Sequence, residues 1–475
     1  MLTLKKSYHF VFFVGIFILP FNSEIPEAFS FLGEYSVESS PIFFLFAFML
    51  LLLDSLIKGK LFFPVKSIEY NIFVLFFIII CLATLFNLFN IIDYYFKQTS
   101  GLERFMRQFI SILMISVVFF TLFINVCRNY GVINFFLILR KVFFISFIVV
   151  FSCGIIEHII VSYNLKGLIP LVELYNYLPF VDIKLDYRLA RISSTTFEPP
   201  ALGSYLITIS GFMFSYIFTS KKRLRILPFI MVVILALMTK SRTAFVIIFV
   251  QIAIGVYYSY YKYPKFRSLF TKGVLVGSVL GLFVVIFNGK SIASGISERI
   301  EALDFVNNVD YNTSENAVSN KSRLGIQFAM FQVFKDSPII GTGWGQHTFE
   351  SRHYYPDWAL KNNYEFTTRY LNEDLKSFPP GYNMYMRLLA ETGIIGLCTF
   401  LFFLFIIVNR AFYYYKFQKS HNYIHIALII SFFGYILNWL QIDSFRLYGF
   451  WISLAILIML HQSRNEKNNS SHTAL

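Results

Sequence analysis

The chain has 475 residues, of which 56% are hydrophobic and 14% charged, and its formal net charge is +14. With a mean hydropathy of +0.61, it cannot fold into a soluble sphere without exposing a large apolar surface. The composition therefore excludes an ordinary soluble domain and indicates an integral membrane protein. We expect an all-α polytopic fold in which residues 1–475 form a single membrane domain.

Apolar segments long enough to cross a bilayer recur along the whole chain. About 20 apolar residues span the roughly 30 Å hydrocarbon core as a helix. We expect about twelve spans, near residues 8–21, 41–57, 69–91, 105–126, 141–163, 200–219, 226–239, 243–261, 270–287, 383–408, 424–441 and 447–461. Residues 288–382, between the ninth and tenth spans, are polar and are expected to form one long loop.

Lys and Arg collect in every second connection between the expected spans. Positive charge is retained on the cytoplasmic side of a membrane, so we expect both termini in the cytoplasm and the loop 288–382 on the outer face. This placement accounts for the net charge without a nucleic-acid partner, since the long loop is close to neutral. All four cysteines fall within or at the ends of spans and indicate neither a disulfide framework nor a metal site.

Arginines on the expected outer face run against this charge pattern and are candidates for anion binding. Arg188 and Arg191 are three residues apart, so on a helical turn both guanidinium groups would face one anion. Arg242 lies in a short outer turn, at the depth of a lipid phosphate. Two structural alternatives stay open: a solvated pair beside neighbouring aspartates for the first two, and contact with lipid headgroups for Arg242.

The long loop is expected to contain one amphipathic helix. Leu324, Phe328 and Phe331 would follow one face of a helix over residues 321–335, which would lie on the bilayer. Arg323 falls near the expected start of this helix. It is a third candidate for binding an anion.

A glycine-rich segment follows that helix. It reads GTGWG and lacks the strand and helix that flank a dinucleotide-binding loop. Gly341, Gly343 and Gly345 are expected to allow positive φ angles and to expose backbone N–H groups to an anion. His347 and His353 have no nearby His or Cys that would complete a metal site; each is either a general base or a solvated loop residue.

Charged residues also fall near the expected outer ends of the spans. They are Glu157, Arg387, Glu391, Asp443 and Arg446. Charges at such a depth usually face a protein interior or a water-filled vestibule. Together they suggest a polar cavity that opens outward, and salt bridges between helices are the structural alternative.

The order of these features resembles the bacterial O-antigen polymerase and O-antigen ligase superfamily. The strongest likeness runs from about residue 335 to 400, through KDSPIIGTGWGQH and NMYMRLLAETGIIGLCTFLF, and the SRTA segment at residues 241–244 supports it. The resemblance implies a metal-independent glycosyltransferase, without cofactor, that uses undecaprenyl-diphosphate-linked glycans at the outer face of the bacterial inner membrane in lipopolysaccharide synthesis. Arg191, Arg242 and Arg323 would then bind the diphosphate, with Arg188 as a weaker fourth.

The residues before the tenth span bear on which reaction the chain performs. Ligases of this superfamily commonly have a His-Asn pair there, whereas this chain has Tyr382 and Asn383, which favours a polymerase of lipid-linked repeat units. Glu198, His347 and His353 are the candidates for general base.

The expected partners are the lipid-linked glycan, membrane lipids and a chain-length regulator protein, with no nucleic acid. Two other activities stay open. One is an O-antigen ligase that transfers glycan to a lipid A core. The other is a flippase or secondary transporter, against which we see no internal repeat.

Overall fold

The computed structural model describes residues 2–188, 190–220, 225–273, 275, 315–418 and 420–472. These residues are predominantly helical and contain almost no strand, which confirms the all-α expectation. The sheet found among them is a short antiparallel hairpin, β1 (Tyr95–Phe96) and β2 (Thr99–Ser100).

The first half of the described chain contains most of the apolar helices. Its helices are α1 (Leu2–Ile18), η1 (Glu27–Tyr35), α2 (Ser40–Lys58), α3 (Ile68–Phe86), α4 (Leu88–Asp93), α5 (Gly101–Leu113), η2 (Met114–Phe119), α6 (Phe120–Tyr130), α7 (Val132–Tyr163), η3 (Lys166–Leu168), α8 (Ile169–Glu173), η4 (Leu174–Tyr177), α9 (Pro199–Phe214) and α10 (Tyr216–Thr219).

The second half adds five further apolar helices and the helices of the long loop. They are α11 (Leu227–Met238), α12 (Arg242–Lys262), η5 (Pro264–Phe266), α14 (Glu315–Asp336), α15 (His347–Ser351), α16 (Asp357–Leu360), η6 (Phe366–Tyr370), α17 (Met384–Phe417), α18 (Asn422–Asn438) and α19 (Tyr448–His472).

Seven helical stretches among the described residues are long and apolar enough to cross a membrane, and three shorter apolar helices accompany them. Each expected span except the ninth coincides with a helix. Most of the ninth, residues 270–287, lies outside the described residues. The protein is therefore a helical membrane protein with many spans.

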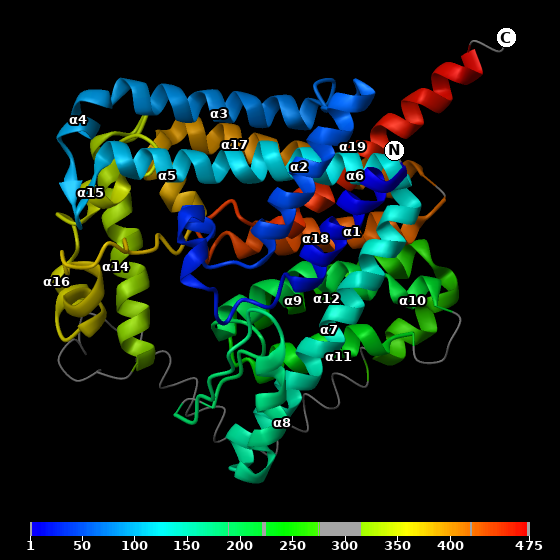
Figure 1. Ribbon diagram of the computed structural model, residues 1–475, viewed down its shortest axis with the longest axis horizontal. Coiled ribbons are helices and arrows are strands. Elements are labelled where there is room, and N and C mark those ends of the chain that lie inside the picture. Colours follow the sequence, from blue (N-terminus) through cyan, green and yellow to red (C-terminus); the bar gives the residue numbers. More distant parts are fainter. Residues whose placement is uncertain are drawn as a thin grey trace.

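The helices of the long loop lie at one end of the molecule, and both chain termini lie at the other (Figure 1). The figure shows α3, α5 and α17 running in nearly the same direction, with α14 roughly perpendicular to them at their end. Aromatic side chains fill the space between the spans. Phe73 of α3, for example, lies with its ring centroid 4.9 Å from that of Trp451 and 5.3 Å from that of Phe403.

Polar side chains at two helix starts satisfy backbone N–H groups that the helix leaves free. The Ser100 hydroxyl accepts a hydrogen bond from the N–H of Glu103 at the start of α5. The Asn383 amide oxygen accepts from the N–H groups of Tyr385 (3.0 Å) and Met386 (3.2 Å) at the start of α17. Each cap fixes where a long apolar helix begins.

Helix α17 is interrupted at Gly393, whose φ is 63° and ψ −165°. The chain around Pro338 packs into this break, and the N–H of Ile394 donates to the Pro338 carbonyl (2.9 Å). A Cβ atom at Gly393 would lie 2.3 Å from the backbone of Ile339, so only glycine fits here. The two segments that carried the family resemblance therefore pack directly against each other.

The glycine segment, residues 341–345, lies beside the same part of α17. The expected positive φ angles are confirmed, at 73° for Gly341, 97° for Gly343 and 81° for Gly345. However, the N–H of Gly343 donates to the Glu391 carbonyl (2.9 Å) and that of Trp344 to the Thr84 hydroxyl (3.1 Å). These N–H groups therefore donate to protein acceptors, in place of the anion that we expected.

Helix α14 corresponds to the expected amphipathic helix. Leu324, Phe328 and Phe331 are 39–43% exposed along one side. The opposite side packs into a second small core with Phe366 and Tyr370. The expectation that Arg323 lies near the helix start is wrong, because the helix already begins at Glu315 and places this arginine mid-helix.

Candidate functional site

A cavity of about 710 Å³ opens where the long loop meets the ends of several apolar helices. Segments far apart in the sequence form its walls: residues 19–22 and 37–38, 196–208, 365–382 and 441–449, together with two side chains of α14. Four arginines and four carboxylates lie among its lining residues. A polar cavity is present near these helix ends, and of the five charged residues expected to form it, Asp443 and Arg446 line it whereas Glu157, Arg387 and Glu391 do not.

Three of the arginines, Arg191, Arg323 and Arg369, come from three different segments. Arg323 stands with its guanidinium carbon 5.0 Å from the ring centre of Tyr382. Among the residues that the structure describes, its Nε has no hydrogen-bond partner. Guanidinium groups that line one cavity are suited to bind a phosphate or diphosphate.

The proposed pairing of Arg188 with Arg191 is wrong. Their segment is not a helical turn: Asp186 and Arg191 form an isolated antiparallel bridge. The N–H of Arg188 donates to the Asp186 carboxylate (3.0 Å), which stabilises the turn between them. Arg191 lines the cavity, whereas Arg188 is exposed and does not.

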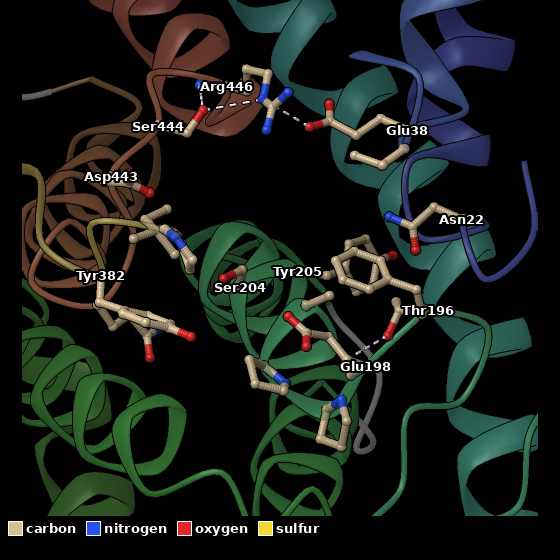
Figure 2. A pocket seen from close by; sticks show the side chains of 18 of the residues that line it. Asn22, Glu38, Thr196, Glu198, Ser204, Tyr205, Tyr382, Asp443, Ser444 and Arg446 are labelled. Carbon is tan, nitrogen blue, oxygen red and sulfur yellow. Dashed lines mark hydrogen bonds and ion pairs between the residues drawn. The ribbon is translucent and has the colours of Figure 1, made fainter. Parts of the chain in front are cut away.

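Glu198 points into the cavity from the residue just before α9 (Figure 2). Within the described part of the chain, no hydrogen bond or ion pair engages its carboxylate. The surrounding protein withdraws solvent and raises the pKa of this carboxyl above its ordinary value, against the lowering effect of Arg323 and Arg369. It is therefore a stronger proton acceptor than an ordinary surface glutamate.

A buried carboxylate fixes the turn that leads to Glu198. Glu157 of α7 is fully buried and accepts hydrogen bonds from the N–H groups of Ser193 (3.1 Å) and Ser194 (2.7 Å). The Thr195 hydroxyl in turn donates to the Pro20 carbonyl (2.9 Å). Glu157 thus positions the cavity wall without lining the cavity.

Tyr382 and Asn383, both expected to bind substrate, have different surroundings. Tyr382 lines the cavity, and its hydroxyl lies 2.7 Å from that of Tyr370. Asn383 is outside the lining: its side chain caps α17, and its NH₂ group donates to Gln327 of α14 (3.2 Å). Asn383 therefore joins two helices rather than facing the cavity.

One buried lysine holds the segment that carries Arg369. Lys97 lies at the turn between β1 and β2 and is 1% exposed. Its ammonium donates to three carbonyl oxygens, those of Arg369 (2.6 Å), Asn372 (2.7 Å) and Leu375 (3.2 Å). These bonds replace the hydrogen bonds to water that the ammonium loses when it is buried.

The wall across from Glu198 has a different character (Figure 2). We call it the Asp443 wall; it comprises Glu38, Gln441, Asp443, Ser444, Arg446 and Tyr448. The Arg446 Nε lies 3.2 Å from a Glu38 carboxylate oxygen and 3.1 Å from the Ser444 hydroxyl. The Tyr448 hydroxyl donates to the other Glu38 oxygen.

A second layer of charge lies behind this wall. Glu34 is 3.3 Å from Arg104 and 3.8 Å from Arg446. Burial alone would raise the pKa of Glu34, but these two guanidinium groups hold it below its ordinary value. Glu34 therefore stays ionised and helps to neutralise Arg446.

Asp443 itself is fixed by its neighbours. One carboxylate oxygen, Oδ2, accepts a hydrogen bond from the N–H of Gly381 (2.8 Å). Arg387 donates to the Asp443 carbonyl (2.8 Å), and its side chain also binds Glu391 (3.0 Å) and Gln108 (2.8 Å). The salt bridge between Arg387 and Glu391 is thus structural, which was the alternative to a cavity role for this pair.

Four other candidates lie away from the cavity lining. His347 is buried next to α17. Its burial and the neighbouring cations Arg387 and Arg104 lower its pKa well below the ordinary value. His353 is exposed beside Arg352. The glycine segment is packed against α17, and Arg242 is exposed at the first residue of α12.

Sequence reasoning did not select Glu38, Glu365 or Arg369 as site residues. Arg446 and Asp443 were noted for their depth in the membrane, which was an informative signal. Arg369 was also visible as a cation on the expected outer face, the same signal that had identified Arg191. Nothing local in the sequence marks Glu38, because its role depends on a partner 408 positions further along the chain.

Comparison with known proteins finds a similarity over part of the chain. A model of the O-antigen ligase family matches residues 227–401. The match supports the O-antigen ligase and polymerase superfamily. A search of curated proteins finds no match to this sequence.

The matched region of this superfamily covers part of the cavity. It includes Arg323, Arg369 and Tyr382, together with the glycine segment and the break in α17. Arg191, Glu198 and the Asp443 wall lie outside it. The cavity therefore combines the matched region with parts of the chain that only the fold brings to it.

Replacing Lys97 by Met is expected to loosen residues 369–375, because three carbonyl oxygens lose their shared donor. Hydrogen exchange measured by mass spectrometry should rise in that segment, with a loss of about 1–3 kcal/mol in local stability. Lys376→Met removes an exposed lysine directly after this segment and serves as the control. Equal exchange in both variants would contradict the role of Lys97.

Proposed function

We propose that this protein joins lipid-linked oligosaccharide repeat units into a longer surface polysaccharide at the outer face of the bacterial inner membrane. The donor would be a glycan on undecaprenyl diphosphate, and the acceptor an incoming lipid-linked repeat unit. The observation that carries the proposal is the convergence of Arg191, Arg323 and Arg369 around Glu198 in one cavity. The superfamily match supports glycan processing of this general kind.

The expected reaction is a single displacement at a sugar carbon. A hydroxyl oxygen of the acceptor forms a bond to the anomeric carbon of the donor sugar. The bond from that carbon to the diphosphate oxygen breaks, and its electron pair stays on the diphosphate. The hydroxyl proton passes to the base, so the products are a longer glycan and the free lipid diphosphate.

The arginines would act on the leaving group. Negative charge grows on the bridging oxygen as the bond breaks, and guanidinium groups fixed beforehand stabilise that charge without reorganising. Arg323 lines the cavity, and its guanidinium group is suited to such a contact. Arg191 and Arg369, which belong to other segments, would contact the remaining phosphate oxygens.

Glu198 is our choice for the base that accepts the hydroxyl proton. It lacks a hydrogen-bonded or ion-paired partner among the described residues, whereas Glu38 and Asp443 are held by Arg446 and Gly381. A base whose pKa is raised takes up a proton more readily.

The pH dependence of the reaction tests this choice. Because the base must be deprotonated, kcat/KM should fall as pH is lowered through a pKa above that of an ordinary glutamate. Glu198→Gln should lower the rate by about 10²- to 10⁴-fold and remove this acidic limb. Glu373→Gln, a change at an exposed carboxylate, should leave the profile intact. An unchanged acidic limb in Glu198→Gln would rule out Glu198 as the base.

A ligase that transfers finished glycan to a lipid A core is the second candidate, and the description of the matched family favours it. His347 and His353 both lie outside the cavity lining, so neither takes the place of the histidine that ligases commonly have. This favours the polymerase. Expected topology supports either activity, with both termini in the cytoplasm and the cavity on the outer face.

A deletion strain separates the two activities. If the protein is a polymerase, its deletion is expected to leave single repeat units on the cell-surface lipid and to abolish longer chains, as read from the ladder on a gel. Long chains that accumulate on the lipid carrier, with none on lipid A, would instead identify a ligase. Transport of the lipid-linked unit by purified protein in liposomes, without any longer product, would exclude both enzymes in favour of a flippase.

A further inference from the structure

We infer that the Asp443 wall binds the terminal sugar of the acceptor glycan, and that this sugar carries no carboxylate. The inference rests on the proposed function, since it assigns the second substrate of the same cavity. It assigns a sugar-binding site to residues that neither the sequence motifs nor the superfamily match includes.

The charges on opposite sides of the cavity suit different parts of the substrates. Arg446 is flanked by two carboxylates, Glu34 at 3.8 Å and Glu38 at 3.2 Å, so the Asp443 wall presents no surplus cation. The other side of the cavity carries Arg191, Arg323 and Arg369. A diphosphate therefore binds more favourably beside the three arginines, and the Asp443 wall is left for an uncharged group.

Asp443 offers a hydrogen-bond acceptor that is already in position. Its Oδ2 atom is held by the Gly381 N–H, and its carbonyl by Arg387. In the described part of the chain, Oδ1 accepts no hydrogen bond, and the side chain is 22% exposed toward the cavity. An ionised acceptor fixed in this way binds a sugar hydroxyl more strongly than a neutral one does.

The other groups of the wall suit a polyhydroxylated ligand. Gln441 and Ser444 add neutral polar atoms, and Tyr382 adds an aromatic ring at the side. Figure 2 shows Asp443 and Glu198 reaching into the same cavity from different segments. A sugar bound at Asp443 would therefore lie within the cavity that contains the base for its reacting hydroxyl.

The same wall disfavours an acidic sugar. A carboxylate on the acceptor would face Asp443 and Glu38, while Arg446, the cation of this wall, already has two acidic partners. Like charges placed together in a partly dry site cost binding energy and exclude the wrong ligand. We therefore assign the terminal sugar to the neutral or N-acetylated class.

The test uses the full-length protein with two separable substrates. The lipid-linked repeat, purified from a deletion strain, is the donor at fixed concentration. The same oligosaccharide, released from its carrier and blocked at the reducing end, acts only as acceptor and is varied. Asp443→Asn should raise the acceptor KM about tenfold, because an acceptor atom becomes a donor of the same shape. The donor KM should stay within about twofold.

Asp374→Asn makes the same chemical change at an exposed carboxylate outside the cavity, and both KM values should match those of the wild type. An unchanged acceptor KM in Asp443→Asn, or a rise in the donor KM instead, would overturn the inference. Failure of the wild-type protein to lengthen any acceptor would overturn the proposed function itself, which is a distinct outcome.

A second measurement does not depend on any variant. Linkage analysis of the repeat that accumulates in the deletion strain identifies the sugar at its non-reducing end. We expect a sugar without a carboxyl group. A uronic or sialic acid at that position would contradict the assignment even if Asp443→Asn failed to fold.

Discussion

The buried guanidinium of Arg387 is the interaction on which the rest of this structure depends. It is 6% exposed and binds Glu391 on its own helix, Gln108 on α5 and the Asp443 carbonyl between α18 and α19, while it stacks over the Trp344 ring at 4.5 Å. Removing one partner of such a buried pair leaves an uncompensated charge, at a cost of roughly 3–5 kcal/mol. One side chain therefore connects α17, α5, the segment between α18 and α19, and the glycine segment, and the cavity lies beside these contacts.

The polar groups of the molecule fall into two sets with different purposes. Arg387, Lys97 and Glu157 use their polar atoms on protein partners, and each holds a segment of the cavity wall. Arg323 and Glu198 keep polar atoms free of protein partners within the described residues. Buried charges that are fully bonded fix positions, whereas charges left free inside a cavity are available to a ligand.

The sequence was sufficient for the features that repeat locally. Apolar periodicity and length identified the helices, and unusual cations on loops that we expect on the outer face identified Arg191 and Arg323. Long-range pairings could not be predicted. The role of Asn383 as a helix cap depends on Gln327, and the glycine amides found acceptors on α3 and α17 that no local pattern reveals. The expected helical turn at Arg188 failed because a neighbouring aspartate, Asp186, closed a different turn.

The most direct test of the account is polymerisation in vitro by purified protein with a defined lipid-linked repeat. It compares the wild type with Arg323→Ala and with Arg242→Ala, an arginine outside the cavity lining. Loss of the cavity arginine should lower the initial rate on the order of 100-fold, and loss of Arg242 by less than about tenfold. Full activity in Arg323→Ala, or a larger loss in Arg242→Ala, would contradict the claim that this cavity binds the diphosphate.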